Sequence, residues 1–143
     1  MKLRSLSLLS FLLILLALGV VIVGCAQQTH IPTGLIEDVN VQEAFSLIQD
    51  NKDNPDLVII DVRTPAEFAD GHVANAINID FNSGAFREEI SKLDKDKNYL
   101  IYCRSGNRSR GAIDLMKELQ FQEIYHMYQG MIGWTNGGYP TVK

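Results

Sequence analysis

The feature that most constrains this chain is an apolar run that ends at a cysteine and passes through a short polar loop into a helix. Residues 99–102 are aromatic or aliphatic, which is typical of a buried strand, and the run stops at Cys103. Apolar residues then recur at helical spacing from Arg108 to Leu119. A strand, a tight loop and a helix start in this order place the sulfur where loop N–H groups converge at the positive end of a helix dipole.

Cys103 is therefore our candidate nucleophile. Converging N–H groups and the two loop arginines, Arg104 and Arg108, stabilise a thiolate more than a thiol, so they lower the pKa of the sulfur. An ordinary core cysteine would also fit the end of an apolar strand. That alternative leaves the polar and basic loop after Cys103 unexplained.

The N-terminal 24 residues have the pattern of a signal segment and are excluded from the fold. Lys2 and Arg4 precede an almost wholly apolar stretch, which is long enough to be a permanent transmembrane anchor. Its end, Ile-Val-Gly-Cys at residues 22–25, resembles the lipobox of bacterial lipoproteins. The resemblance implies cleavage after Gly24 and lipidation of Cys25. We therefore expect an exported, membrane-anchored lipoprotein outside the cytoplasm, at the cell surface or in the periplasm.

Charge and cysteine content exclude several function classes. The chain of 143 residues has 13 basic and 17 acidic residues and a net charge of −4, without a basic patch, so no nucleic-acid partner is expected. With Cys25 lipidated, Cys103 is the only thiol, and an intramolecular disulfide cannot form. Two distant cysteines cannot make a zinc or iron–sulfur site by themselves, so we expect no metal and no cofactor. A lone thiol in an exported protein is a liability unless its reactivity is used.

The remainder predicts one α/β domain over residues 35–143, joined to the lipid by a tether over residues 25–34. Short apolar strands alternate with helices, which favours a largely parallel sheet. The expected strands are residues 35–39, 57–60, 76–79, 99–102 and 123–127. Capping patterns predict helices after Asn40 and Thr64, and further helices are expected over residues 86–93, 108–119 and 130–137. Ligands of such sheets bind beyond the carboxyl ends of the strands, where the Cys103 loop lies.

Three stretches resemble the motifs of the rhodanese family. They are residues 60–79, residues 102–109 around Cys103, and residues 130–140, and they occur in the family's order and spacing. The resemblance covers about residues 37–142 of this chain. It implies a rhodanese-like α/β fold, with a five-stranded, mostly parallel sheet flanked by helices on both faces.

The resemblance also implies the chemistry of a thiosulfate sulfurtransferase. The Cys103 thiolate would take a sulfane sulfur from a small anionic donor, thiosulfate or a polysulfide, and pass it from a persulfide to a thiol or to cyanide. The loop would bind the substrate, with N–H groups of residues 104–108 around the transferred sulfur. The residues of this substrate-binding loop are Arg104, Ser105, Gly106, Asn107 and Arg108. Arg108 either acts on the thiolate directly or packs at the helix start, and Gly106 supplies a conformation that a Cβ would hinder.

Residues outside the loop are expected to support it. Asp61 would brace the loop by accepting its N–H groups, and Arg63 and Glu67 would form a structural ion pair. His72 is expected to be a hydrogen-bonding residue of a turn. No Asp/His pair is predicted to act as a relay.

Two other functions remain open at this point. Cysteine-dependent phosphatases and arsenate reductases share a related fold, but such phosphatases place five residues between Cys and Arg, whereas four separate Cys103 from Arg108. The narrower loop fits one sulfur atom better than a tetrahedral oxyanion. A membrane-tethered persulfide carrier that delivers sulfur to a partner protein would use the same loop as an enzyme.

Overall fold

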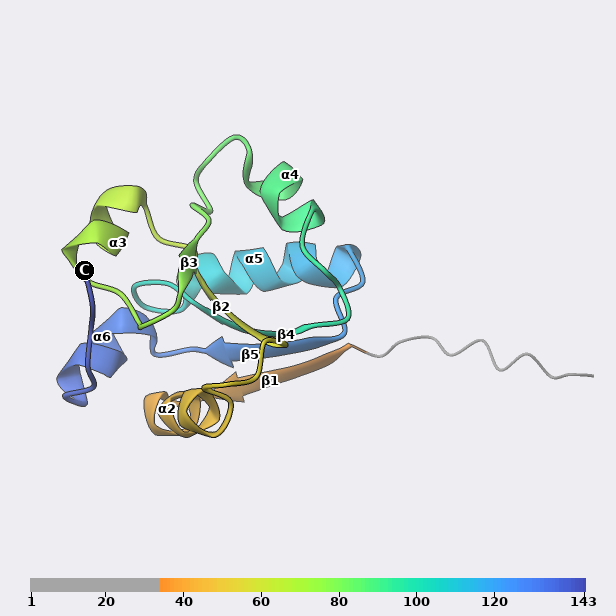
Figure 1. The fold of residues 1–143 in the computed structure, drawn as a ribbon. Coiled ribbons are helices and arrows are strands. Elements are labelled where there is room, and N and C mark those ends of the chain that lie inside the picture. The colour runs from red at the N-terminus through yellow and green to blue at the C-terminus, as the bar shows by residue number, and fades with distance from the viewer. Residues whose placement is uncertain (1–33) are drawn as a thin grey trace, which may run out of the picture. The chain divides into compact units, whose positions relative to one another are not determined.

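A parallel sheet with helices on both of its faces forms the domain (Figure 1). The computed structural model describes residues 34–143. The strands are β1 (Leu35–Val39), β2 (Leu57–Asp61), β3 (Ile77–Asn78), β4 (Asn98–Tyr102) and β5 (Glu123–Met127). The helices are α2 (Val41–Asp50), α3 (Pro65–Asp70), α4 (Phe86–Ser91), α5 (Asn107–Glu118) and α6 (Gly130–Asn136).

The predicted signal segment, the lipidation site at Cys25 and all but the last residue of the predicted tether lie outside the described residues. Among the helices of residues 34–143, none has both the length and the apolar character needed to span a bilayer.

The five strands pair in the order β1-β5-β4-β2-β3, and every pairing is parallel. This confirms the predicted α/β class. The loops after β2 and β4 therefore leave the sheet at the same edge, as the sequence predicts. The register also aligns Asp38, His126 and Ile101 across three neighbouring strands. Side chains in one such row project from the same face of a sheet.

Alternation along the strands divides the core into two layers. Ile60 and Ile101 face α4 and α5, whereas Ile59 and Leu100 face α2 and α6. Figure 1 shows α4 and α5 on one side of the sheet and α2 on the other. Strands that are buried on both faces explain why β2 and β4 have continuous apolar sequences.

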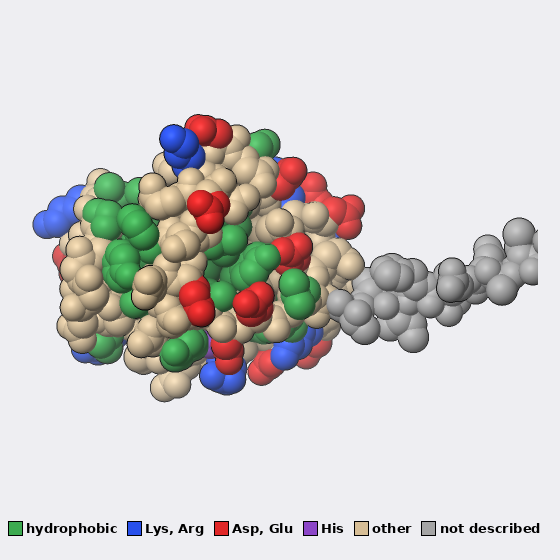
Figure 2. Space-filling model, turned by 90° about the horizontal axis from the view of Figure 1, so that it is seen from below, with side chains coloured by type: hydrophobic (Ala, Val, Ile, Leu, Met, Phe, Trp, Pro, Cys, Tyr) green, Lys and Arg blue, Asp and Glu red, His purple; other side chains and the backbone are tan. Residues whose placement is uncertain are grey.

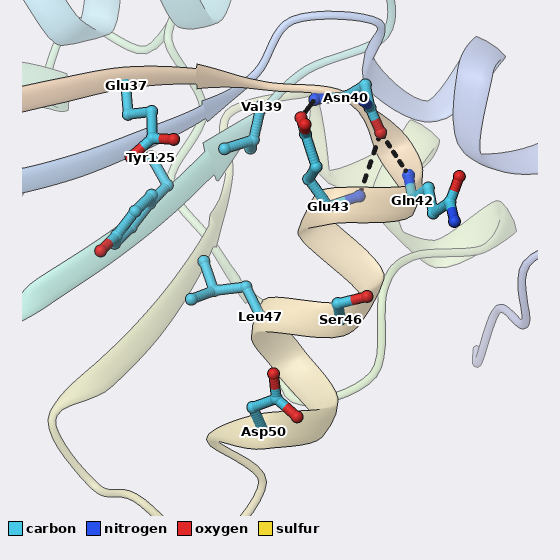
Figure 3. A pocket seen from close by; sticks show the side chains of 9 residues that line it. All are labelled: Glu37, Val39, Asn40, Gln42, Glu43, Ser46, Leu47, Asp50 and Tyr125. Atoms are coloured by element: carbon cyan, nitrogen blue, oxygen red, sulfur yellow. Dashed lines mark hydrogen bonds between the residues drawn. The ribbon is translucent and has the colours of Figure 1, made fainter.

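Both predicted capping boxes are present. Asn40 Oδ1 accepts hydrogen bonds from the backbone N–H groups of Gln42 and Glu43, and the Glu43 carboxylate accepts the Asn40 N–H in return at 2.7 Å (Figure 3). Thr64 and Glu67 make the equivalent exchange at the start of α3. These local bonds satisfy N–H groups that a helix leaves without intrahelical partners.

Two elements are shorter than the sequence predicts. Strand β3 covers only Ile77–Asn78, because the Ala76 N–H bonds to the Val73 carbonyl in a turn. Helix α4 ends at Ser91, since the N–H groups of Lys92 and Leu93 bond three residues back and tighten the last turn.

The charged side chains on the surface agree with the net negative charge of the chain. On the side of the molecule where α2 lies, Figure 2 shows Asp and Glu side chains spread between apolar patches. Exposed apolar side chains elsewhere in the described domain include Tyr128 and Ile132, close to the loop that follows β4.

Candidate active site

The loop between β4 and α5 encloses the sulfur of Cys103. The Cys103 side chain is 1% exposed, and its Sγ accepts a hydrogen bond from the Gly106 N–H at 3.1 Å. Gly106 has a φ of +91°, and a Cβ there would lie 2.3 Å from the Tyr128 carbonyl oxygen. The sequence prediction that Gly106 holds a conformation unsuited to a Cβ is confirmed. A backbone that turns so tightly aims its N–H groups at the sulfur.

The loop favours the thiolate form of Cys103. Burial raises the pKa of the thiol, because it removes water from the charged form. Hydrogen bonds from the Ser109 hydroxyl and from the N–H groups of Ser109, Ser105 and Gly106 outweigh burial, and the net pKa lies below its usual range. Ser109 therefore extends the predicted ring of donors by one residue.

Arg108 is fixed in place by a partner from α3. Its guanidinium donates two hydrogen bonds to the Glu67 carboxylate, with Nη1–Oε2 at 2.7 Å and Nη2–Oε1 at 2.8 Å. This contact is the main cause that raises the pKa of Arg108, and the nearby charge of Cys103 contributes as well. Arg108 is thus both an ion-pair partner at the start of α5 and a positive charge near the sulfur. The remaining polar side chains of the loop, Arg104, Ser105 and Asn107, are exposed.

The predicted partners of Asp61 and Arg63 were wrong. Arg63 pairs with Asp61 at 2.6 Å rather than with Glu67, and this ion pair is buried, with exposed fractions of 8% and 0%. Asp61 accepts hydrogen bonds from the Arg63 backbone and guanidinium instead of from the Cys103 loop. Arg63 also donates to the Gly71 carbonyl at 2.7 Å. The pair therefore orders the connection from β2 through α3, and α3 presents Glu67 to Arg108.

A second set of residues behind the sulfur was missed by the sequence analysis. The Ser109 hydroxyl lies 3.5 Å from Cys103 Sγ and 2.9 Å from Nε2 of His126, and Nδ1 of His126 lies 2.7 Å from the Asp38 carboxylate. The prediction that no Asp/His pair lies in such a position was wrong. Asp38 and His126 are 88 positions apart, and only the β1–β5 register brings them together. Alternation along both strands is the sequence signal that points to a shared face.

His72 has the structural role that the sequence predicts. Its Nδ1 lies 3.0 Å from the Phe68 carbonyl, and its ring stacks on Phe68 with centroids 3.6 Å apart. These contacts hold the end of α3.

A surface hollow adjoins the Cys103 loop. It has a volume of about 310 Å³ and includes Arg104. Its other lining residues are Arg63, Glu67, Asp70, Gly71, Met131, Ile132, Thr135 and Thr141. A second hollow, shown in Figure 3, lies between α2 and strands β1 and β5 and is bordered by Glu37, Glu43 and Asp50. Its acidic border disfavours an anionic ligand, whereas the first hollow offers Arg104 beside the loop.

Gly106→Ala should disrupt the loop that surrounds the sulfur. The added Cβ would meet the Tyr128 carbonyl in a backbone conformation that favours glycine, at a cost of about 1–3 kcal/mol. We expect lower stability in urea unfolding and slower alkylation of Cys103 by iodoacetamide. Gly84→Ala is the matched control, because a Cβ there meets nothing within 4 Å. Equal behaviour of the two variants would contradict the assigned role of Gly106.

The Glu67–Arg108 pair should make stability depend on pH in the acid range. Its hydrogen bonds, together with those from Thr64, lower the pKa of Glu67 from 4.5 to about 2. As the pH falls, Glu67 of the unfolded chain binds a proton at a higher pH than Glu67 of the folded protein does. The stabilisation of the folded state by the Glu67–Arg108 pair is therefore complete above about pH 4.5 and is lost as the pH falls toward 2. Glu67→Gln should reduce the loss of unfolding free energy between about pH 5 and pH 3. Glu118→Gln, which breaks an exposed pair with Arg87, is the control and should leave that loss unchanged.

Comparison with known proteins identifies the family of this fold and loop. The family model described as a Rhodanese-like domain matches residues 44–137. A sulfurtransferase of Allochromatium vinosum is 34% identical over 104 residues, which cover 73% of this chain and 95% of that protein. The crystal structure of a rhodanese-related protein from Thermoplasma volcanium matches with a TM-score of 0.61 and 30% identity, over 74% of this chain and 97% of that one.

The same domain is similar to one part of larger proteins. The tRNA uridine(34) hydroxylase of Photorhabdus laumondii is 31% identical over 115 residues, which cover 76% of this chain but only 31% of that enzyme. The match to the sulfurtransferase, in contrast, covers 95% of that protein. The chain therefore belongs to the rhodanese-like sulfurtransferase family.

Proposed function

We propose that this protein transfers a sulfane sulfur from thiosulfate or a polysulfide to a thiol or cyanide through a persulfide on Cys103. The observation that carries the proposal is the environment of the Cys103 sulfur. A buried thiol whose pKa lies below its usual range, and whose Sγ accepts the Gly106 N–H at 3.1 Å, has the surroundings that a nucleophilic cysteine needs.

The reaction divides into two displacements at sulfur. The Cys103 thiolate attacks the outer sulfur of thiosulfate, the S–S bond of the donor breaks, and sulfite leaves with the bonding electrons. Cyanide or a thiolate acceptor then attacks the terminal sulfur of the persulfide, and the electrons of that S–S bond return to Cys103. One covalent intermediate thus serves both half-reactions.

The loop residues supply charge and hydrogen bonds for these steps. N–H groups that face the sulfur of Cys103 would also stabilise the negative charge of the persulfide. Arg104, which is exposed in the hollow beside the loop, would attract the anionic donor, while Arg108 keeps a fixed positive charge near the sulfur. Asp61 and Arg63 act at a distance, through α3 and Glu67.

Loop size favours sulfur transfer over phosphoryl transfer. Four residues separate Cys103 from Arg108, and the guanidinium of Arg108 is occupied by both oxygens of Glu67. A phosphatase needs that guanidinium for the oxyanion of its substrate. Rapid hydrolysis of an aryl phosphate by the purified protein would favour the phosphatase instead.

We infer from the lipobox-like sequence alone that the domain is exported and held at a membrane by a lipid on Cys25. A short tether of this kind suits a persulfide carrier that serves a partner protein at the membrane surface. The carrier and the enzyme differ in kinetics. Slow turnover with cyanide, combined with fast transfer to one partner protein, would identify the carrier.

Cys103→Ser should reduce thiosulfate:cyanide sulfurtransferase turnover to the rate of the uncatalysed reaction, because a hydroxyl cannot form the persulfide. The assay follows thiocyanate formation by the full chain purified in detergent. Cys25→Ser is the control, since it removes the other cysteine and should leave turnover unchanged. Turnover that survives in Cys103→Ser but is lost in Cys25→Ser would contradict the proposal.

A further inference from the structure

A continuous chain of hydrogen-bonding groups connects the buried sulfur of Cys103 with the exposed carboxylate of Asp38. The steps are Cys103 Sγ to Ser109 Oγ at 3.5 Å, Ser109 Oγ to His126 Nε2 at 2.9 Å, and His126 Nδ1 to Asp38 Oδ1 at 2.7 Å. The first three side chains are at most 1% exposed, whereas that of Asp38 is 56% exposed. This series of hydrogen-bonded groups is therefore buried at the Cys103 end and exposed to solvent at the Asp38 end.

The protons in this chain can be placed from its ends. An ionised Asp38 only accepts, so Nδ1 of His126 carries the hydrogen that points toward it. Nε2 of the neutral ring is then an acceptor, and the Ser109 hydroxyl donates to it. With the sulfur as a thiol, the lone pairs of Ser109 Oγ then face Cys103 and can receive its proton, whereas the hydrogen bond that Ser109 Oγ donates to Cys103 Sγ at 3.5 Å belongs to the thiolate.

The geometry points to a proton-transfer chain in which Ser109 and His126, oriented by Asp38, take the proton of the Cys103 thiol. The S–H bond breaks and its proton passes to Ser109 Oγ, while the Ser109 hydroxyl proton passes to Nε2 of His126. The electron pair stays on sulfur, and the products are a thiolate and an imidazolium with no change in total charge. Ser109 then donates to the thiolate, and the imidazolium remains paired with Asp38. The inference rests on the proposed function, because it assigns an activation step to the same nucleophile.

Ser109 acts as a switch because it has one proton and three acceptors within reach. These are Cys103 Sγ, the Gly106 carbonyl at 3.0 Å and His126 Nε2. While the imidazole is neutral, Nε2 attracts the Ser109 proton away from the sulfur. Once Nε2 is protonated it becomes a donor, and the Ser109 hydroxyl turns toward the thiolate.

The charges around His126 leave Asp38 as its decisive partner. Helix α5 brings two cations and one carboxylate to the cavity of about 280 Å³ that Asp38 and His126 line, whereas the β4 residue beside His126 is the apolar Ile101. The charged residues from α5 are Arg110, Asp114 and Lys117. Two cations and two carboxylates balance each other across this cavity, so the contact at 2.7 Å with Asp38 dominates the stability of the imidazolium. Arg108 also interacts with the charge of Cys103, and this interaction does not pass through Ser109 or His126.

The same hydrogen bonds could serve only to join α5, β5 and β1. A structural chain of that kind would affect stability when it is broken, but it would leave the titration of the Cys103 thiol unchanged once the protein is folded. A proton-transfer chain would move that titration even in a fully folded variant. The two roles therefore differ in the pH dependence of the thiolate.

The test measures the alkylation rate of Cys103 by iodoacetamide against pH, using intact-protein mass and the full chain with Cys25→Ser as the reference. His126→Gln keeps an amide near Ser109 but cannot take a proton, and it should raise the midpoint of the profile by about one pH unit or more. This corresponds to alkylation that is about tenfold slower at pH values below both midpoints. Asp38→Asn should shift the midpoint in the same direction by a smaller amount.

Two controls match these variants. Glu37→Gln removes the same charge from the neighbouring residue of β1, whose side chain points to the other face of the sheet. His72→Asn removes an imidazole that bonds only within the end of α3. Neither should move the midpoint. Far-ultraviolet circular dichroism confirms that each variant is folded, and Asp38→Asn, at an exposed position, keeps the test decisive if His126→Gln does not fold.

Unchanged midpoints in both His126→Gln and Asp38→Asn would overturn the proton-transfer chain, as would equal shifts in Glu37→Gln. The outcome is independent of sulfur transfer, because alkylation reports only the thiolate. A reference protein that alkylates with the expected profile but never accepts sulfur from thiosulfate would refute the proposed function and leave the proton-transfer chain intact.

Discussion

The rest of this site depends on removing a sulfur anion from water without destabilising its charge. Burial alone would keep Cys103 protonated and inert, as it does for core cysteines. The loop offsets that burial with backbone N–H groups and the Ser109 hydroxyl, so that the pKa of the buried thiol is lowered rather than raised. The positive φ of Gly106 and its close approach to the Tyr128 carbonyl follow from this requirement, because they aim the N–H groups inward.

Charged pairs hold the loop from outside. The buried Asp61–Arg63 pair orders the segment that enters α3. Glu67 of α3 forms an ion pair with Arg108 in the first turn of α5. Glu67 performs two tasks at once, since it also accepts the N–H and hydroxyl hydrogens of Thr64 in the capping box. A contact of this kind makes the position of a cation near the sulfur depend on the fold of a segment 41 residues earlier in the chain.

Sequence patterns predicted what is local and missed what is distant. The strand periodicity, both capping boxes and the conformation of Gly106 depend on neighbouring residues, and each is present in the structure. Partners of the charged residues depend on which strands become neighbours. Arg63 was therefore assigned to Glu67 instead of Asp61, and the pairing of Asp38 with His126 was not foreseen. In both cases several residues of suitable charge could pair with the side chain, and the tertiary structure decides which of them becomes its partner.

The most direct measurement of the central claim is the intact mass of the full chain carrying Cys25→Ser after incubation with thiosulfate. The account predicts a gain of one sulfur atom on Cys103, which cyanide then removes. No gain with thiosulfate or with polysulfide, from a folded protein whose thiol still reacts with iodoacetamide, would contradict the assignment of Cys103 as a persulfide-forming nucleophile.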